Sequence, residues 1–169
     1  MTEPDDAVKK SWEQRVADLW ATIDDDDPAD FIARFQALAA ERAPDDPIAL
    51  FELAGAYDST GHPEQAAPLY RQALAAGLKG EQRRRTVIQL ASTLRNLGHA
   101  GESVALLTAE REAGSDDLDD AVAAFLALAL IDTGREREAA ALALAALSRH
   151  LPRYNRSLAN YARALVDGE

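Results

Sequence analysis

Apolar residues recur in one fixed order along three stretches of the chain, and each stretch is centred on a glycine. In the first stretch, each apolar residue has another one three or four positions away on its side of the glycine. The apolar residues and the glycine are Leu50, Leu53, Ala54, Tyr57, Gly61, Ala66, Tyr70 and Ala73. Apolar residues at these spacings form one face of an α-helix. The pattern therefore predicts two short antiparallel helices joined by a turn at the glycine, which accepts the left-handed conformation that ends many helices.

The same order returns 37 positions later, from Leu50 to Val87, and again 36 positions after that, from Val87 to Ala123. The second copy contains Val87, Leu90, Ala91, Leu94, Gly98, Ser103 and Leu107, with Glu110 out of pattern; the third contains Ala123, Leu126, Ala127, Leu130, Gly134, Ala139, Ala143 and Ala146. A period of this size is typical of helical repeats. A single helix pair cannot bury its own apolar face, so we expect an all-α solenoid of stacked antiparallel pairs.

The first copy resembles the tetratricopeptide repeat. Residues 47–76 match its pattern of large, small and aromatic positions in the first helix and alanine, aromatic and alanine in the second. In the later copies, Leu94 and Leu130 replace the first helix's aromatic residue, and both intervals exceed the usual ~34 residues. The resemblance, which is to the small stand-alone bacterial members, implies a right-handed superhelix that binds protein partners as an adaptor or scaffold.

The predicted organisation is a flexible acidic tail over residues 1–7 and a single repeat domain over residues 8–169. Within it we expect a degenerate leading helix pair (8–43), three repeats (47–80, 81–116 and 117–150) and a capping helix (151–169). About nine helices are predicted, over 8–23, 28–42, 47–60, 63–76, 81–97, 100–113, 118–133, 135–150 and 152–166. In the last helix, an apolar stripe is expected to cover the final repeat; it contains Tyr154, Leu158, Tyr161 and Leu165.

The net charge of −11 is concentrated at the N-terminal end. Residues 1–30 contain ten acidic residues against Lys9, Lys10 and Arg15, whereas residues 149–163 contain four arginines and no acidic residue. An acidic chain is a poor general binder of nucleic acid. The longest apolar run, residues 121–131, is far shorter than the ~20 residues of a membrane span, and the N-terminus lacks an apolar signal region. We therefore expect a cytoplasmic protein that binds neither membranes nor nucleic acid.

The sequence indicates no catalytic, metal or cofactor site. It lacks cysteine, a nucleophile elbow and a phosphate-binding glycine loop. The aspartates at 24–27 do not begin a calcium loop, because Ala29 and Phe35 stand where that loop needs glycine and glutamate. His62 and His99 lie a whole repeat apart. The glutamates are scattered singly on polar faces, so nothing suggests a buried pair of carboxylates with separated pKa values, and we expect no enzyme activity.

The resemblance also implies a concave groove lined by the first helix of each repeat. Carried over residue by residue, the candidate partner-binding residues are Phe51, Asp58, Arg85, Ile88, Ser92, Arg95 and Asn96. Some members of the family hold the terminal carboxylate of a peptide with lysine and asparagine side chains in this groove. Phe51 and Gly55, at the fifth and ninth positions of the first copy, depart from that pattern. Arg85 and Arg95 can instead hold an acidic side chain through charge-assisted hydrogen bonds, which favours an acidic-hydrophobic partner segment. The alternative for residues 83–85 is a solvated helix surface that interacts with nearby acids.

A second hypothesis follows from the opposite charges of the two ends. An acidic N-terminal pair and a basic C-terminal helix can associate head to tail, which would make the protein a self-assembling homo-oligomer. Both hypotheses remain open from the sequence alone.

Overall fold

The computed structural model describes residues 10–167, and the tail predicted for residues 1–7 lies outside this range. The described residues form nine α-helices and no strand. In chain order they are α1 (Trp12–Trp20), α2 (Pro28–Ala39), α3 (Pro47–Ser59), α4 (Pro63–Ala75), α5 (Gly80–Asn96), α6 (Ala100–Ala113), α7 (Asp119–Asp132), α8 (Glu136–Ser148) and α9 (Asn155–Ala164). The all-α prediction is confirmed.

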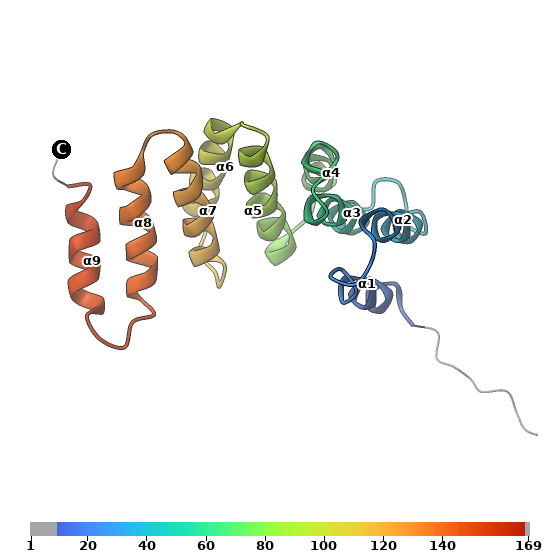
Figure 1. The fold of residues 1–169 in the computed structure, drawn as a ribbon, viewed down its shortest axis with the longest axis horizontal. Coiled ribbons are helices and arrows are strands. Elements are labelled where there is room, and N and C mark those ends of the chain that lie inside the picture. The colour runs from blue at the N-terminus through green and yellow to red at the C-terminus, as the bar shows by residue number, and fades with distance from the viewer. Residues whose placement is uncertain (1–9, 168–169) are drawn as a thin grey trace, which may run out of the picture.

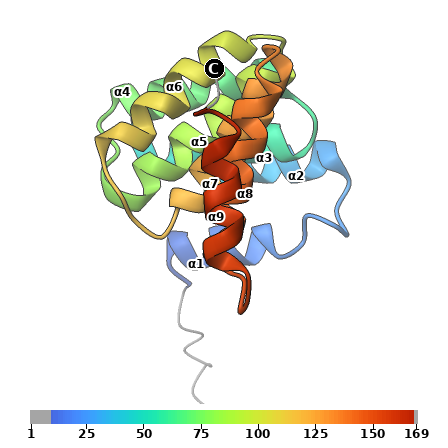
Figure 2. The same ribbon diagram turned by 90° about the vertical axis from the view of Figure 1, so that its left-hand side faces the viewer.

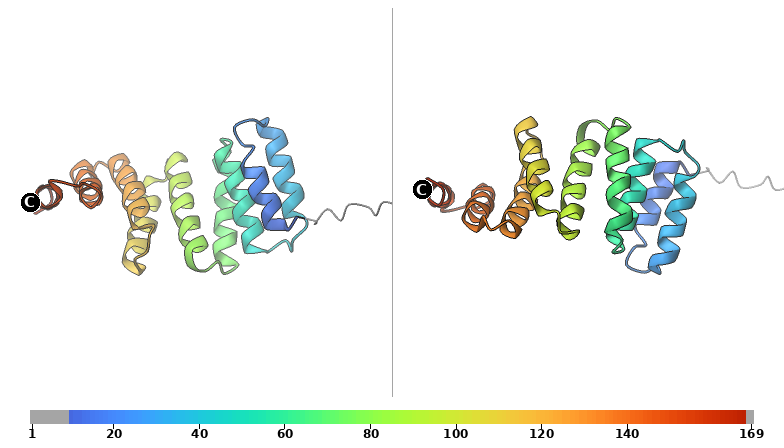
Figure 3. Two further views of the ribbon diagram at one scale, coloured as in Figure 1. Left: turned by 90° about the horizontal axis from the view of Figure 1, so that it is seen from below. Right: turned by 90° about the horizontal axis from the view of Figure 1, so that it is seen from above.

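Each helix packs against the next, and the helices follow one another in chain order from one end of an elongated body to the other (Figure 1). In addition, α5 contacts both α3 and α7, so the first helices of successive pairs lie side by side. The views from below and above show the same stack lengthwise, with α1 and α2 at one end and α9 at the other (Figure 3). Seen along the stack, α9 lies in front of the other helices (Figure 2). This arrangement is the predicted solenoid of antiparallel helix pairs.

Glycines and capping residues set the helix ends as the pattern predicts. Gly61, Gly98 and Gly134 follow α3, α5 and α7 with φ angles of 81°, 84° and 74°, a region that favours glycine because it has no Cβ. Asp27 and Asp46 accept hydrogen bonds from the first turns of α2 and α3. Each is followed by a proline, which has no N–H to leave unpaired at the first helical position.

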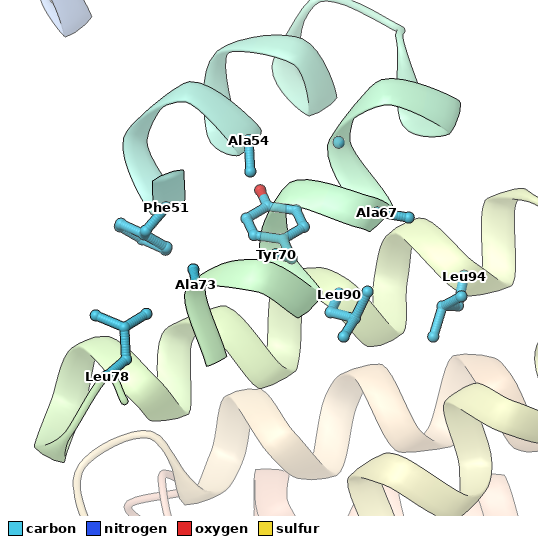
Figure 4. Packing of buried hydrophobic residues seen from close by; sticks show 9 residues of the cluster. Phe51, Ala54, Ala67, Tyr70, Ala73, Leu78, Leu90 and Leu94 are labelled. Carbon is cyan, nitrogen blue, oxygen red and sulfur yellow. The ribbon is translucent and has the colours of Figure 1, made fainter. Parts of the chain in front are cut away.

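Small side chains allow the helices to approach closely in the core. Ala54 and Ala91 have 0% of their surface exposed, as have Ala66 and Ala73 on α4. Around Ala54, the side chains of Phe51 and Tyr70 meet between α3 and α4, and Leu90 and Leu94 of α5 complete the cluster (Figure 4). These four alanines are therefore contact positions between helices, whereas Ala143, a repeated alanine of the third copy, is exposed.

Glu110, the residue of the second copy that departs from the apolar pattern, is buried. Its side chain is 4% exposed and accepts hydrogen bonds from Arg83, with 2.9 Å between Nη1 and either carboxylate oxygen. The Arg84 side chain, 6% exposed, lies 3.5 Å from Glu110, 2.9 Å from Asp116 and 2.6 Å from Asp119. Charged groups can be buried together when they pair. The cluster ties α5 to α6, to the α6–α7 connection and to α7.

Two predicted helices differ from the structure at their ends. Helix α1 begins at Trp12 because Ser11 and Gln14 form a reciprocal capping box before it, and it ends at Trp20. In the last helix, Tyr154 is 78% and Tyr161 is 71% exposed, while Ala162 is buried. Tyr154 lies just before α9 in the left-handed conformation, with φ of 66°. The buried face of α9 is therefore not the predicted tyrosine stripe.

Enlarging a contact alanine tests the packing. Ala54→Leu and Ala91→Leu should each lower the free energy of unfolding by about 1 to 3 kcal/mol, because extra methyl groups overpack a filled interface. Urea unfolding measures the change. Ala109→Leu, at an exposed position of α6, is the control and should change stability by less than about 0.5 kcal/mol. Neutral results at both buried positions would show that the helix register is wrong.

Candidate partner-binding groove

A groove with a volume of about 590 Å³ runs across α1, α3 and α5, the first helices of three successive pairs. Aromatic and apolar side chains alternate with polar ones along its walls. The lining residues are Trp12, Glu13, Val16, Ala17, Trp20, Ile48, Phe51, Glu52, Gly55, Ser59, Gln82, Arg85 and Gln89. Of the seven residues predicted to bind a partner, Phe51 and Arg85 line this groove.

Trp20 of α1 is held against α3 by two features. Gly55 leaves room for its indole ring, because a Cβ at this position would lie 3.1 Å from Trp20 Cζ2. The indole Nε1 donates a hydrogen bond of 2.6 Å to the Glu52 carboxylate. Burial raises the pKa of Glu52, while the hydrogen bond from Trp20 and the charge of Arg85 oppose the increase. Glu52 thus fixes the aromatic wall of the groove.

The opposite wall presents hydrogen-bonding groups from α5. The guanidinium of Arg85 lies 5.4 Å from the centre of the Phe51 ring, a cation–π distance. One turn further along α5, the buried Oε1 of Gln89 has no hydrogen-bond partner among the described residues. Because this oxygen is buried, the Gln89 amide would have to turn toward the groove before the oxygen could accept a backbone N–H of a bound segment.

The structure places Asp58 between helices rather than on the groove wall. Its carboxylate accepts hydrogen bonds from Thr93 Oγ1 at 3.0 Å and from the Tyr70 hydroxyl at 3.5 Å, and so joins α3, α4 and α5. Burial raises the pKa of Asp58 above its usual value, and the two hydrogen bonds act in the opposite direction. Asp58 is therefore occupied by contacts within the fold.

The other predicted residues lie further along α5. Ile88 is buried in the apolar cluster shared with α7. The guanidinium of Arg95 lies 2.6 Å from the Asp132 carboxylate of α7. Ser92 is half-buried, and Asn96 is exposed. Arg95 is thus paired within the chain, whereas Arg85 forms no salt bridge among the described residues and is exposed.

An exposed apolar pair lies beside this part of α5. Leu128 is 42% and Ile131 is 49% exposed on α7, next to the Arg95–Asp132 ion pair that joins the ends of the two helices. Large apolar side chains exposed at adjacent positions of one helix face are typical of contact surfaces. We call the groove together with Leu128 and Ile131 the first-helix face.

The predicted site leaves out several groove residues: Trp12, Trp20, Glu52, Gln82 and Gln89. The sequence contains a signal for Gln82 and Gln89. They lie three positions before and four positions after Arg85, a predicted site residue, and so share its helix face. Trp20 and Glu52 carry no such signal. Their pairing across 32 positions depends on how α1 packs against α3.

Within residues 10–167, no group of three or more histidine, cysteine, aspartate or glutamate side chains is arranged to hold a metal ion. None of the helices in this range has both the length and the apolar character needed to cross a bilayer.

Comparison with known proteins gives one match. The family model described as tetratrico peptide repeat matches residues 47–165. No curated protein and no solved structure matches the chain.

The raised pKa of Asp58 predicts a pH-dependent contribution to stability. A carboxyl whose pKa is higher in the folded than in the unfolded state binds more protons when folded, so its contribution to stability falls as pH rises between the two values. The free energy of unfolding of the wild type should therefore fall relative to that of Asp58→Asn from about pH 4 upward. Urea unfolding at a series of pH values measures the difference, and a difference independent of pH would contradict the assignment.

Proposed function

Because the chain belongs to the tetratricopeptide repeat family, we propose that it is a non-catalytic interaction module whose first-helix face binds a segment of a partner protein. Repeats of this family generally mediate contacts between proteins. The observation that supports the proposal most is the aromatic and polar groove that crosses α1, α3 and α5. Leu128 and Ile131 add two exposed apolar side chains on α7, the first helix of the next pair.

The chemistry of this face favours a partner segment that combines a carboxylate with apolar side chains. Arg85 is the cation of the groove lining, and it forms no salt bridge among the described residues. A guanidinium binds a carboxylate through two parallel hydrogen bonds. The apolar side chains of the same segment would contact Leu128 and Ile131, whose burial contributes roughly 25 cal/mol per Å² of apolar surface.

Two acidic residues of the groove limit where that carboxylate binds. Glu13 and Glu52 line the α1 side, and Glu52 is fixed by Trp20. A partner carboxylate near them would be repelled, so it should bind on the α5 side beside Arg85.

Charge reversal in the groove tests this proposal. Arg85→Glu should reduce partner capture at least tenfold, because it replaces the attractive charge with a repulsive one. Lys79→Glu makes the same change in charge at an exposed position outside the groove and should leave capture unchanged. Binding is measured by titration with the captured partner, and circular dichroism checks that each variant is folded.

A matched pair of variants tests the apolar part of the face. Ile131→Asp should weaken the same binding, whereas Leu147→Asp on α8, where the wild-type residue is also 49% exposed, should not. If Arg85→Glu and Ile131→Asp both bind as tightly as the wild type, the partner binds elsewhere.

Self-association through the two ends is the second candidate function. Seven acidic residues lie in residues 10–30 against Lys10 and Arg15, while the four arginines of residues 149–163 have no acidic neighbour within that segment. The ends that carry these opposite charges lie at opposite extremes of the solenoid (Figure 1).

A further inference from the structure

A second cavity, with a volume of about 760 Å³, lies at the C-terminal end of the solenoid between α8 and α9. The end of α6 and the α7–α8 turn also contribute to it. Its lining includes four arginines, Arg111, Arg135, Arg137 and Arg163. We call it the arginine cavity.

Among residues 10–167, a carboxylate pairs with one of these arginines. Arg135 forms two hydrogen bonds of 2.7 Å with Glu138. Arg137 donates to the backbone carbonyl of Leu165 at 3.3 Å, and Arg163 donates to the amide of Asn160. Neither of these acceptors carries a charge. Arg111 forms no ion pair or hydrogen bond among the described residues.

The excess of positive charge is local to this cavity. Of the carboxylates in the part of the chain that the structure describes, Glu136 and Glu138 line the cavity, so three guanidinium groups without an ion pair there accompany Glu136, in a chain of net charge −11. Like charges gathered at one cavity repel each other. A bound anion with more than one carboxylate would remove this repulsion.

The rest of the cavity lining is apolar. Leu142, Ala145, Ala162 and Val166 line it, and the side chain of Val166 is exposed. An apolar wall excludes water from one side of an ion pair and so strengthens the attraction between its charges. The arginine cavity therefore fits a compact acidic turn better than an apolar helix.

The acidic turn between α1 and α2 matches this chemistry. It contains four consecutive aspartates at 24–27, two of which have structural roles: Asp26 pairs with Arg34, and Asp27 caps α2. Asp24 and Asp25 are exposed, and their side chains form no hydrogen bond or ion pair among the described residues. Two adjacent carboxylates are thus free to bind other cations.

We propose that the acidic turn of one copy, through Asp24 and Asp25, docks into the arginine cavity of a second copy. This proposal rests on the second candidate function, self-association, and it identifies the two surfaces that would meet in that contact. Because α1 and α2 lie at one end of the solenoid and α9 at the other (Figures 1 and 3), the turn and the cavity of one molecule do not meet. Contacts between unlike surfaces continue from copy to copy, so this contact builds open chains or, where the rotation between copies closes, rings.

Sedimentation of the full-length protein over a range of concentrations tests the proposal. The weight-average mass of the wild type should rise above the 18.2 kDa of the monomer as concentration increases, and it should fall back when salt is raised from about 0.05 to 0.5 M. Two charge-reversed variants should remain monomeric at all concentrations. One is Asp24→Lys with Asp25→Lys, and the other is Arg111→Glu with Arg163→Glu.

Mixing the two variants gives the sharpest result. Each variant keeps one wild-type surface, the cavity in the first and the acidic turn in the second, and the two reversed surfaces also carry opposite charges. An equimolar mixture should therefore regain the association of the wild type, although each variant alone is monomeric. Arg71→Glu with Lys79→Glu changes the same amount of charge away from both surfaces and should associate like the wild type. Circular dichroism melting confirms that all variants fold.

Each contrary outcome has a distinct meaning. A wild type that is monomeric at low salt overturns self-association and this site together. A wild type that associates, with the arginine variant associating equally, leaves self-association intact and shows that the arginine cavity is not its site. Loss of association in the arginine variant alone would indicate a contact between two C-terminal ends and would overturn the acidic turn as the occupant.

Discussion

Close approach of helices at fully buried alanines is the constraint on which the solenoid depends. Ala54, Ala66, Ala73 and Ala91 have no exposed surface, and each allows a neighbouring helix to pack without a gap. Since a helix pair cannot bury its apolar face alone, every pair requires the next. The same stacking places α1, α3 and α5 side by side and thereby forms the groove, which no single repeat contains.

Charged contacts fix the stack where the apolar pattern weakens. In the second copy, Glu110 occupies a position that is alanine in the other two, and Arg83 and Arg84 surround it with compensating charge. Buried ion pairs add little net stability, but losing one partner is costly because the other charge stays buried. Arg84 therefore restricts which register of α5, α6 and α7 is acceptable. The Arg95–Asp132 pair also joins α5 to α7, but its side chains are 29% and 36% exposed, so it contributes less to this restriction.

The repeated residues predict the helices well because their spacing is local. Gly61, Gly98 and Gly134 mark turns, and the apolar positions between them mark the faces that pack. Side-chain partners are harder to predict, since they depend on long-range packing. Glu110 looks like a misplaced surface residue until α5 is packed beside it. Trp20 and Glu52, 32 positions apart, gain a role only when Gly55 brings their helices together. For the same reason, Phe51 and Arg85 line the groove, while Asp58 and Arg95 are engaged within the fold.

Hydrogen–deuterium exchange tests the central claim, that a partner binds the first-helix face, most directly. The protein is compared with and without its captured partner at a concentration too low for self-association. Binding on this face should slow exchange in α1, α3, α5 and α7 and leave α4, α6 and α8 unchanged. Slower exchange confined to α4, α6 and α8 would place the partner on the opposite face and contradict the claim.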